Sequence, residues 1–258
     1  MAADSRAPRL AVLIDADNTS ARIASGLFEE IAKIGEASVR RIYGDFSGTR
    51  LRAWSDILST HAILPHQNFA YVPGKNASDI ALVVDAMDLL HSDRFDGFCL
   101  VSSDSDFTRL AARIREQGTD VYGFGEQKTP ESFRQACRRF IYTENLLPQA
   151  PKLGKAEPLE AAQSEALKPP SAATPLIRKA IDQLEEGSDW VPLSRIGHLL
   201  ANLFSDFDPR TYGHAKLRDL VEKTGAFETR HEDGRGVYIR AKPSHRKPSP
   251  PKTSGTSA

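Results

Sequence analysis

The chain has 258 residues, of which 40% are hydrophobic and 26% are charged, as in an ordinary globular protein. No apolar run approaches the roughly eighteen residues that a membrane-spanning helix needs, which argues against a membrane protein. The net charge is 0, so any nucleic-acid binding must use a local basic patch rather than an overall positive field. The N-terminal residues lack a signal-peptide core, and we therefore expect a cytoplasmic protein with no membrane partner.

Composition divides the chain into four parts. Residues 8–147 alternate short apolar runs with helical periodicity, and we expect them to form one domain. Residues 148–174 are rich in proline, alanine and charge, which predicts a flexible linker. Residues 175–241 regain periodicity and predict a second, smaller domain. Residues 242–258 contain 4 basic and no acidic residues, and we expect a disordered basic tail.

In the first part, apolar runs that predict strands alternate with segments of helical spacing. The expected strands are 10–14, 38–43, 62–65, 97–102, 121–124 and 140–142. The expected helices are 20–34, 48–60, one that starts near Ser78, 105–117 and 131–138. In the helix after Ser78, one apolar stripe is expected to comprise Ile80, Val83, Val84, Met87 and Leu90. This alternation predicts an α/β fold in which a parallel sheet is covered on both faces.

The second domain has a different pattern. Apolar residues at helical spacing predict one helix from residue 176 to a stop at Gly187, a second over 193–203 and a third from residue 212 to Gly225. Two short strands, 227–230 and 237–240, then flank a turn rich in glycine and charge. Three helices followed by a hairpin predict a small winged helix-turn-helix domain.

Acidic residues follow the ends of two expected strands. Asp15 ends the first strand, Asp104 and Asp106 follow the strand 97–102, and Asp79 lies in the first turn of the helix after Ser78. In an open parallel sheet, ligands bind outside the carboxyl ends of the strands, so these side chains can meet in one crevice. Taken singly, each acid is better explained as a helix cap or as a charge that stabilises the helix dipole, and only their convergence indicates a site.

Such a cluster needs a cation. A pair of like charges about 4 Å apart costs on the order of a few kcal/mol in a protein, so clustered carboxylates require protons or metal ions. An all-oxygen ligand set suits Mg²⁺ or Mn²⁺ rather than zinc. Two such ions can activate a water molecule and stabilise the leaving oxygen of a phosphoryl displacement. The acids therefore indicate phosphodiester hydrolysis.

The same residues carry a family resemblance. The segments L-I-D-A-D-N, G-K-N-A-S-D-I-A-L-V-V-D-A-M-D and C-L-V-S-S-D-S-D-F, in this order, resemble a bacterial, LabA-like NYN domain of the PIN-like ribonuclease superfamily. The resemblance covers about 9–146 and implies a three-layer α/β/α fold. It implies that the metal ligands are Asp15, Asp79, Asp104 and Asp106, with Asn18 as a further catalytic residue. It also implies secondary roles for Asp17, Lys75, Asp85, Ser102 and Ser103, of which Asp17 matches a more variable position.

The second domain resembles an OST-HTH, or LOTUS, domain. The resemblance rests on V-P-L-S-R-I-G-H-L-L, on F-D-P-R-T-Y-G and on G-V-Y-I-R. That family has a winged-helix fold and is linked to RNA binding and, in some members, to protein partners. Candidate RNA contacts are Arg210, Lys216, Arg218, Arg230, Arg235 and Tyr238. Solvated surface charge is the competing interpretation for each of the basic residues.

Three functions remain open at this point. The first is a Mg²⁺- or Mn²⁺-dependent ribonuclease with a C-terminal RNA-binding module. The second is a non-catalytic adaptor that binds RNA or docks proteins. The third is a haloacid-dehalogenase-like phosphatase, because D-A-D-N-T at 15–19 fits the D-x-D-x-T pattern of that family, with Asp15 as nucleophile and Asp17 as general acid.

Overall fold

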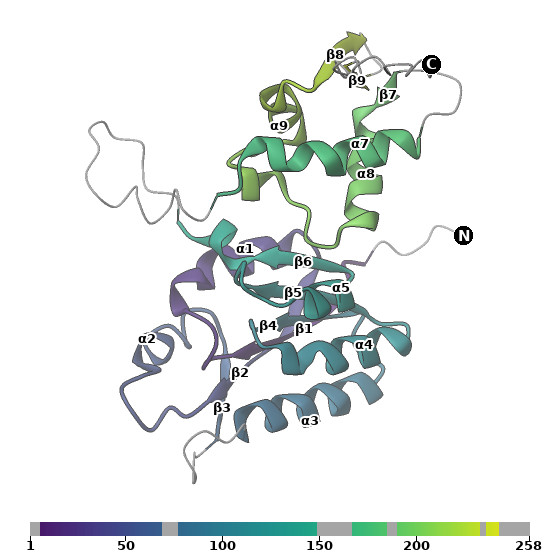
Figure 1. The fold of residues 1–258 in the computed structure, drawn as a ribbon. Coiled ribbons are helices and arrows are strands. Elements are labelled where there is room, and N and C mark those ends of the chain that lie inside the picture. Colours follow the sequence, from purple (N-terminus) through teal and green to yellow (C-terminus); the bar gives the residue numbers. More distant parts are fainter. Residues whose placement is uncertain (1–5, 69–76, 149–166, 185–189, 233–235, 243–258) are drawn as a thin grey trace, which may run out of the picture.

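A computed structural model describes residues 6–68, 77–148, 167–184, 190–232 and 236–242. The described chain forms two units, each with its own sheet (Figure 1). The first unit holds two hydrophobic clusters and the second holds one. None of the described helices is both long and apolar enough to cross a membrane.

The first unit is built on a sheet of six parallel strands in the order β3-β2-β1-β4-β5-β6. The strands are β1 (Arg9–Asp15), β2 (Glu36–Gly44), β3 (Leu64–Gln67), β4 (Gly97–Val101), β5 (Asp120–Gly125) and β6 (Arg139–Tyr142). Residues 10–14 of β1 are fully buried because helices cover both faces of this central strand.

Helices occupy both faces of the sheet. They are α1 (Ala24–Ala32), α2 (Arg52–Ser55), α3 (Ala77–His91), α4 (Thr108–Glu116) and α5 (Glu131–Ala136). Short 3-10 turns are η1 (Ala21–Ile23), η2 (Ser105–Phe107) and η3 (Thr143–Leu146). Alternate residues of β1 enter different clusters: Leu13 packs with α3, α4 and α5, and Val12 packs with α1 and α2. The expected three-layer α/β/α fold is therefore confirmed.

Two local predictions in this unit were wrong. The helix expected over 48–60 is only α2, and turns occupy most of the remainder. The stripe expected on α3 is wrong at Ile80 and Val84, which are 65% and 54% exposed. Its other members do pack on the core, since Leu90 is buried and Val83 and Met87 contact the core cluster, but the buried face also includes Leu82, Ala86 and Leu89. Apolar residues lie on every side of α3, so spacing alone could not identify the side that packs on the sheet.

The second unit is a winged helix-turn-helix, as expected. Its helices are α7 (Thr174–Asp182), α8 (Leu193–Leu203) and α9 (Leu217–Thr224), with 3-10 turns η4 (Pro170–Ala173) and η5 (Pro209–Tyr212). Its antiparallel sheet has the order β7-β9-β8, formed by β7 (Val191–Pro192), β8 (Phe227–Glu232) and β9 (Gly236–Ala241). Ile177, Ile196, Leu220 and Ile239 meet in its core.

Three predictions for this part need correction. The third helix is interrupted at Gly213, whose φ of 79° ends η5 four residues before α9 begins. The two-residue strand β7 was not expected. The predicted linker ends too late, because Ala173 is fully buried in the core and the Lys168 amide donates to the Thr211 carbonyl. The rest of that linker (149–166), Gly187 and the tail 243–258 lie outside the described residues.

Candidate active site

Parallel strands place the first acidic residues at one edge of the sheet. β1 and β4 are neighbours, with Ile14 opposite Val101, so Asp15 and Ser102 leave the sheet side by side. The Ser102 hydroxyl donates to Asp15 Oδ2 at 2.6 Å. Two segments that are 87 residues apart in sequence are thus joined at the carboxyl edge of the sheet.

Asp15 is held in one orientation by four donors. It is only 1% exposed, and its Oδ2 accepts from the Asn18 side chain at 2.9 Å as well as from Ser102. Its Oδ1 accepts from the backbone amides of Asp17 at 3.1 Å and Asn18 at 3.3 Å. Burial raises the pKa of Asp15 above its ordinary value, and hydrogen bonds from Ser102 and Asn18 oppose that rise.

The second acidic loop is linked to the first by the same hydroxyl. Ser102 Oγ accepts from the Asp104 amide at 3.1 Å while it donates to Asp15. Asp104 Oδ1 in turn accepts from the Asp106 amide at 2.9 Å, so Asp104 caps η2. Asp104 therefore caps a helical turn and also belongs to the acidic cluster.

Asp79 brings α3 into the cluster. Its pKa is raised to about 6, first by burial and then by the negative charges of Asp15, Asp104, Asp17 and Asp106. The carboxylates of three separate segments thus act on one another. Their mutual repulsion makes this edge of the sheet a place where a cation lowers the electrostatic energy.

The secondary residues lie in different surroundings. Asp17 contacts Arg50 and accepts from the Ser78 hydroxyl at 3.1 Å, so it connects the first acidic loop to the start of α3. The Ser103 hydroxyl accepts from the Glu126 amide at 2.9 Å. Lys75 lies outside the described residues.

Asp85 belongs to a separate group of side chains. Its Oδ2 accepts from the Tyr43 hydroxyl at 2.7 Å and from Arg41 at 2.9 Å, and it lies 3.3 Å from His66 Nδ1. Burial and then Asp85 raise the pKa of Tyr43, so the Tyr43 hydroxyl remains a donor. Asp85 therefore attaches α3 to β2 and β3 and does not face the acidic cluster.

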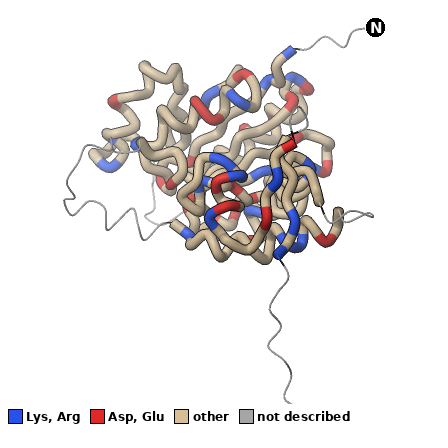
Figure 2. Tube along the Cα trace, turned by 90° about the horizontal axis from the view of Figure 1, so that it is seen from above, with Lys and Arg blue, Asp and Glu red and all other residues tan. Residues whose placement is uncertain are grey.

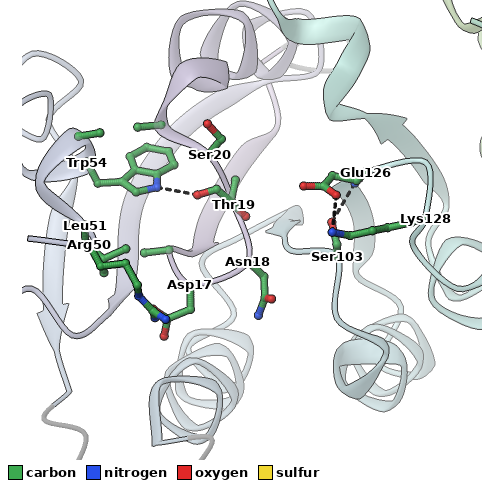
Figure 3. Close-up of a pocket in the computed structure, with 13 residues that line it drawn as sticks. Asp17, Asn18, Thr19, Ser20, Arg50, Leu51, Trp54, Ser103, Glu126 and Lys128 are labelled. Carbon is green, nitrogen blue, oxygen red and sulfur yellow. Dashed lines mark hydrogen bonds and ion pairs between the residues drawn. The ribbon is translucent and has the colours of Figure 1, made fainter. Parts of the chain in front are cut away.

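A cavity of about 400 Å³ opens beside the acidic loops. Figure 3 shows Arg50 and Lys128 on opposite sides of it, with Asp17 and Asn18 between them. Lys128 pairs with Glu126 at 2.7 Å, and Trp54 donates from Nε1 to the Thr19 carbonyl at 2.9 Å. Polar walls with a cation on each side suit a phosphate backbone.

Four charged or aromatic residues that line this cavity were not expected from the sequence. They are Arg50, Trp54, Glu126 and Lys128. Glu126 directly follows β5, whereas Asp15 is the last residue of β1, so the strand-end argument could have found Glu126. Arg50 and Trp54 come from the segment between β2 and β3, where no sequence pattern indicated a site.

A smaller, apolar groove of about 230 Å³ adjoins the other side of the acids. It is lined by Asp79, Ile80, Val83, Val84, Asp106 and Phe107. Asp17 borders the polar cavity, and Asp79 and Asp106 border the apolar groove. Asp17, Asp79 and Asp106 therefore border two hollows of different character.

The donor chemistry of the cluster fits a hard divalent cation. Its carboxylate and amide oxygens are the ligand type that Mg²⁺ and Mn²⁺ prefer. Within the described ranges, no three acidic, histidine or cysteine side chains are already arranged as a ligand set. Mg²⁺ commonly keeps several waters and uses only one or two carboxylates directly, so a loosely gathered cluster is compatible with it.

The candidate RNA-binding residues of the winged unit are dispersed. Arg230 and Arg240 lie over the Trp190 ring at 5.8 and 4.8 Å from its centroid, and Tyr238 is opposite Arg230 in the hairpin. Arg218 pairs with Glu222 on α9, and Lys216 immediately precedes that helix. Arg235 lies outside the described residues.

Arg210 occupies a different place, in an ion pair with Glu30 of the first unit. Figure 2 shows basic and acidic segments interspersed on the viewed face. The winged unit therefore does not present all its candidate residues on one basic surface.

Comparisons with known proteins agree with the two-unit architecture. A family model described as the NYN domain matches residues 9–147, and one described as the OST-HTH/LOTUS domain matches residues 168–239. No curated protein matches the chain. Among solved structures, a protein of unknown function from Vibrio parahaemolyticus is similar, with 20% identity and a TM-score of 0.46. That likeness covers 55% of this chain and 96% of the other.

Proposed function

Because the chain belongs to the NYN domain family, within the PIN-like nuclease superfamily, we propose that it is a divalent-metal-dependent ribonuclease. The OST-HTH/LOTUS region would bind the RNA and could also contact protein partners. The observation that carries the proposal is the Ser102 hydroxyl, which donates to Asp15 and accepts from the Asp104 amide, so that two acidic loops meet at one edge of the sheet. The pKa of Asp79, raised first by burial and then by the neighbouring carboxylates, agrees with this arrangement. A membrane partner forms no part of the proposal.

In this mechanism the metal ligands are Asp15, Asp79, Asp104 and Asp106. A bound Mg²⁺ or Mn²⁺ supplies activation of water and stabilisation of the leaving oxygen. Ser102 and Asn18 orient the Asp15 carboxylate by hydrogen bonds.

Cations at the polar cavity position the substrate. Arg50 and Lys128 would contact phosphates on either side of the scissile bond. A water oxygen bonds to phosphorus as the bond from phosphorus to the leaving ribose oxygen breaks. The water gives up one proton and the leaving oxygen takes up one, which yields a phosphate monoester end and a hydroxyl end.

The test is cleavage of labelled single-stranded RNA in Mn²⁺. We expect Asp15→Asn, Asp79→Asn and Asp104→Asn each to lose at least about a hundredfold in rate, because each removes charge from the ion site. Asp88→Asn is the matched control, since Asp88 is an exposed acid on the same helix as Asp79. Cleavage by the three variants at the wild-type rate would contradict the proposal.

The adaptor hypothesis predicts a different result in the same assay. A non-catalytic adaptor would bind the RNA with no divalent-dependent cleavage by the wild-type chain, across several RNA sequences. An assay that shows binding alone would replace the nuclease proposal with this one.

The family match favours the nuclease over the phosphatase hypothesis. The residues at 15–19 lie within the NYN match, and Asp17 contacts Arg50 and Ser78. A phosphatase would lose all activity in Asp17→Asn, whereas we expect this variant to cut RNA faster than Asp104→Asn does.

A further inference from the structure

The winged unit contacts the outer edge of the nuclease sheet. In Figure 1 the segment between α8 and α9 lies against β6, which is the last strand of the sheet. The Phe140 amide points away from β5 and donates to the Ser205 carbonyl at 2.7 Å. The Ser205 hydroxyl donates to the Arg134 carbonyl at 2.8 Å. An edge strand thereby receives a backbone partner from the second unit.

The next residue of this segment binds two side chains of the first unit. Asp206 accepts from the Tyr142 hydroxyl at 2.5 Å and contacts Arg134. Arg134 also donates to the Tyr142 hydroxyl at 2.7 Å, which closes a three-membered network. The Arg134 and Asp206 side chains are mostly shielded from solvent, where charge-assisted hydrogen bonds are strong.

A buried carboxylate of α1 provides the second anchor. Arg210 bonds to Asp208 within the segment and reaches Glu30 Oε2 at 2.9 Å. Glu30 is only 3% exposed. Burial opposes its ionisation, but hydrogen bonds from Lys33 and Arg210 hold its pKa below the ordinary value. Arg139 of β6 also pairs with Glu30, so loss of Arg210 would remove one of the three cations, Lys33, Arg139 and Arg210, that contact this buried charge.

The rest of the segment is shaped for this contact. Asp208 caps η5 by accepting from the Arg210 amide at 2.9 Å, which fixes the backbone of the F-D-P-R-T-Y-G motif. Thr211 accepts from the Asn145 side chain at 3.1 Å, and Lys168 lies over the Tyr142 ring. Backbone and ionic contacts therefore occur together along residues 205–212, and Lys168 adds a cation–π contact from outside this segment.

We propose that residues 205–212 are an intramolecular docking segment whose partner is the edge of β6 together with Glu30 of the same chain. The segment holds the winged unit in one orientation, with the β8–β9 hairpin on the side away from the nuclease sheet (Figure 1). Arg210 acts in this interface and not in RNA binding. This inference is independent of whether the chain cleaves RNA.

Hydrogen exchange at one backbone amide tests the proposal in the full chain. The Phe140 amide bonds to Ser205 across the interface, so its exchange, followed by NMR, reports docking. We expect protection in the wild type and exchange at least about tenfold faster in Arg210→Glu and in Asp206→Asn, because charged hydrogen bonds are lost. The Val12 amide in the central strand reports whether the first unit stays folded, and Arg218→Gln is the control for a surface arginine.

Two outcomes would overturn the proposal. One is an unprotected Phe140 amide in the wild type, and the other is unchanged protection in both interface variants. If Arg210→Glu fails to fold, Tyr142→Phe removes one hydroxyl from the same interface with little change in shape. X-ray scattering gives an independent measurement, in which the undocked variants have a larger radius of gyration than the wild type and Arg218→Gln.

Discussion

One hydroxyl group connects the two acidic loops. Ser102 Oγ donates to the buried Asp15 carboxylate and accepts from the Asp104 amide. Residues that orient metal ligands in this way commonly matter almost as much as the ligands themselves.

We therefore expect Ser102→Ala to slow RNA cleavage by roughly ten- to a hundredfold, because Asp15 loses its shortest hydrogen bond. Ser102→Thr keeps the hydroxyl and serves as the control. Steady-state rates across a Mn²⁺ titration provide the measurement. Equal rates for the alanine and threonine variants would show that the hydroxyl has no role.

Asp79 makes the metal-free protein less stable as its carboxyl ionises. Its pKa is raised from 3.8 to about 6, so its destabilising effect is absent below pH 3.8 and develops as pH rises through 6. In EDTA at pH 8 we expect Asp79→Asn to unfold a few degrees above the wild type, with little difference at pH 4. Thermal unfolding at the two pH values measures this, and an unchanged or lower transition temperature at pH 8 would contradict it.

The acidic residues could be placed from the sequence because strand ends meet at one edge of a parallel sheet. Asp15, Asp79, Asp104 and Asp106 were singled out in this way. In the structure Ser102 joins Asp15 to the Asp104 loop, and Asp79 and Asp106 line the same groove. Arg50 could not be found, because it contacts Asp17 across 33 residues from a segment without periodicity. Only the folded chain brings such pairs together.

At the scale of elements, α3 carries an acidic residue, Asp85, that holds the helix in place without belonging to the acidic cluster itself. Asp85 attaches α3 to β2 and β3 through Arg41, Tyr43 and His66. Asp79 lies on the same helix, so this attachment helps determine where Asp79 is presented.

We expect Asp85→Asn to lower the free energy of unfolding by about 1–3 kcal/mol, because Arg41 and Tyr43 lose a charged partner. Asp88→Asn, an exposed change of the same kind on the same helix, should have little effect. Urea unfolding curves provide the comparison. A loss of stability that is equal in both variants would contradict a specific role for Asp85.

Strands were easier to predict than helix faces. The run at 10–14 is apolar at every position because the strand is buried on both sides, and its boundaries were close to those of β1. α3 has apolar residues on all sides, so its buried face depends on which side meets the sheet. The sequence around Ile80 and Val84 does not indicate that these two apolar side chains are exposed rather than buried.

At the scale of the whole molecule, we expect the contact between the two units to depend on pH through Glu30. The folded pKa of Glu30 lies below its ordinary 4.5, so its contribution is fully present above pH 4.5 and is lost as pH falls through the folded pKa. After correction for intrinsic exchange, we expect protection of the Phe140 amide to fall with acidification before that of Val12 does. Glu30→Gln should remove this pH dependence, and an identical pH profile in the variant would contradict it.

The sequence predicted both units but not their contact. Periodicity reports how each segment packs locally, and it contains no information on which surface of one unit meets the other. Arg210 was a candidate RNA contact because it is a basic residue at or near the third expected helix. Its partner Glu30 is 180 residues away, and neither residue alone indicates the other.

The docking segment also has a consequence for the length of RNA that the chain can use. If the winged unit is held in one orientation, the path from its hairpin to the acidic cluster has a constant length. RNA shorter than this path can reach the acidic cluster or the hairpin, but not both at once. We therefore expect the affinity for RNA to increase abruptly once the RNA exceeds a threshold length. A freely moving winged unit would give a gradual dependence on length, and Arg210→Glu should convert the first behaviour into the second.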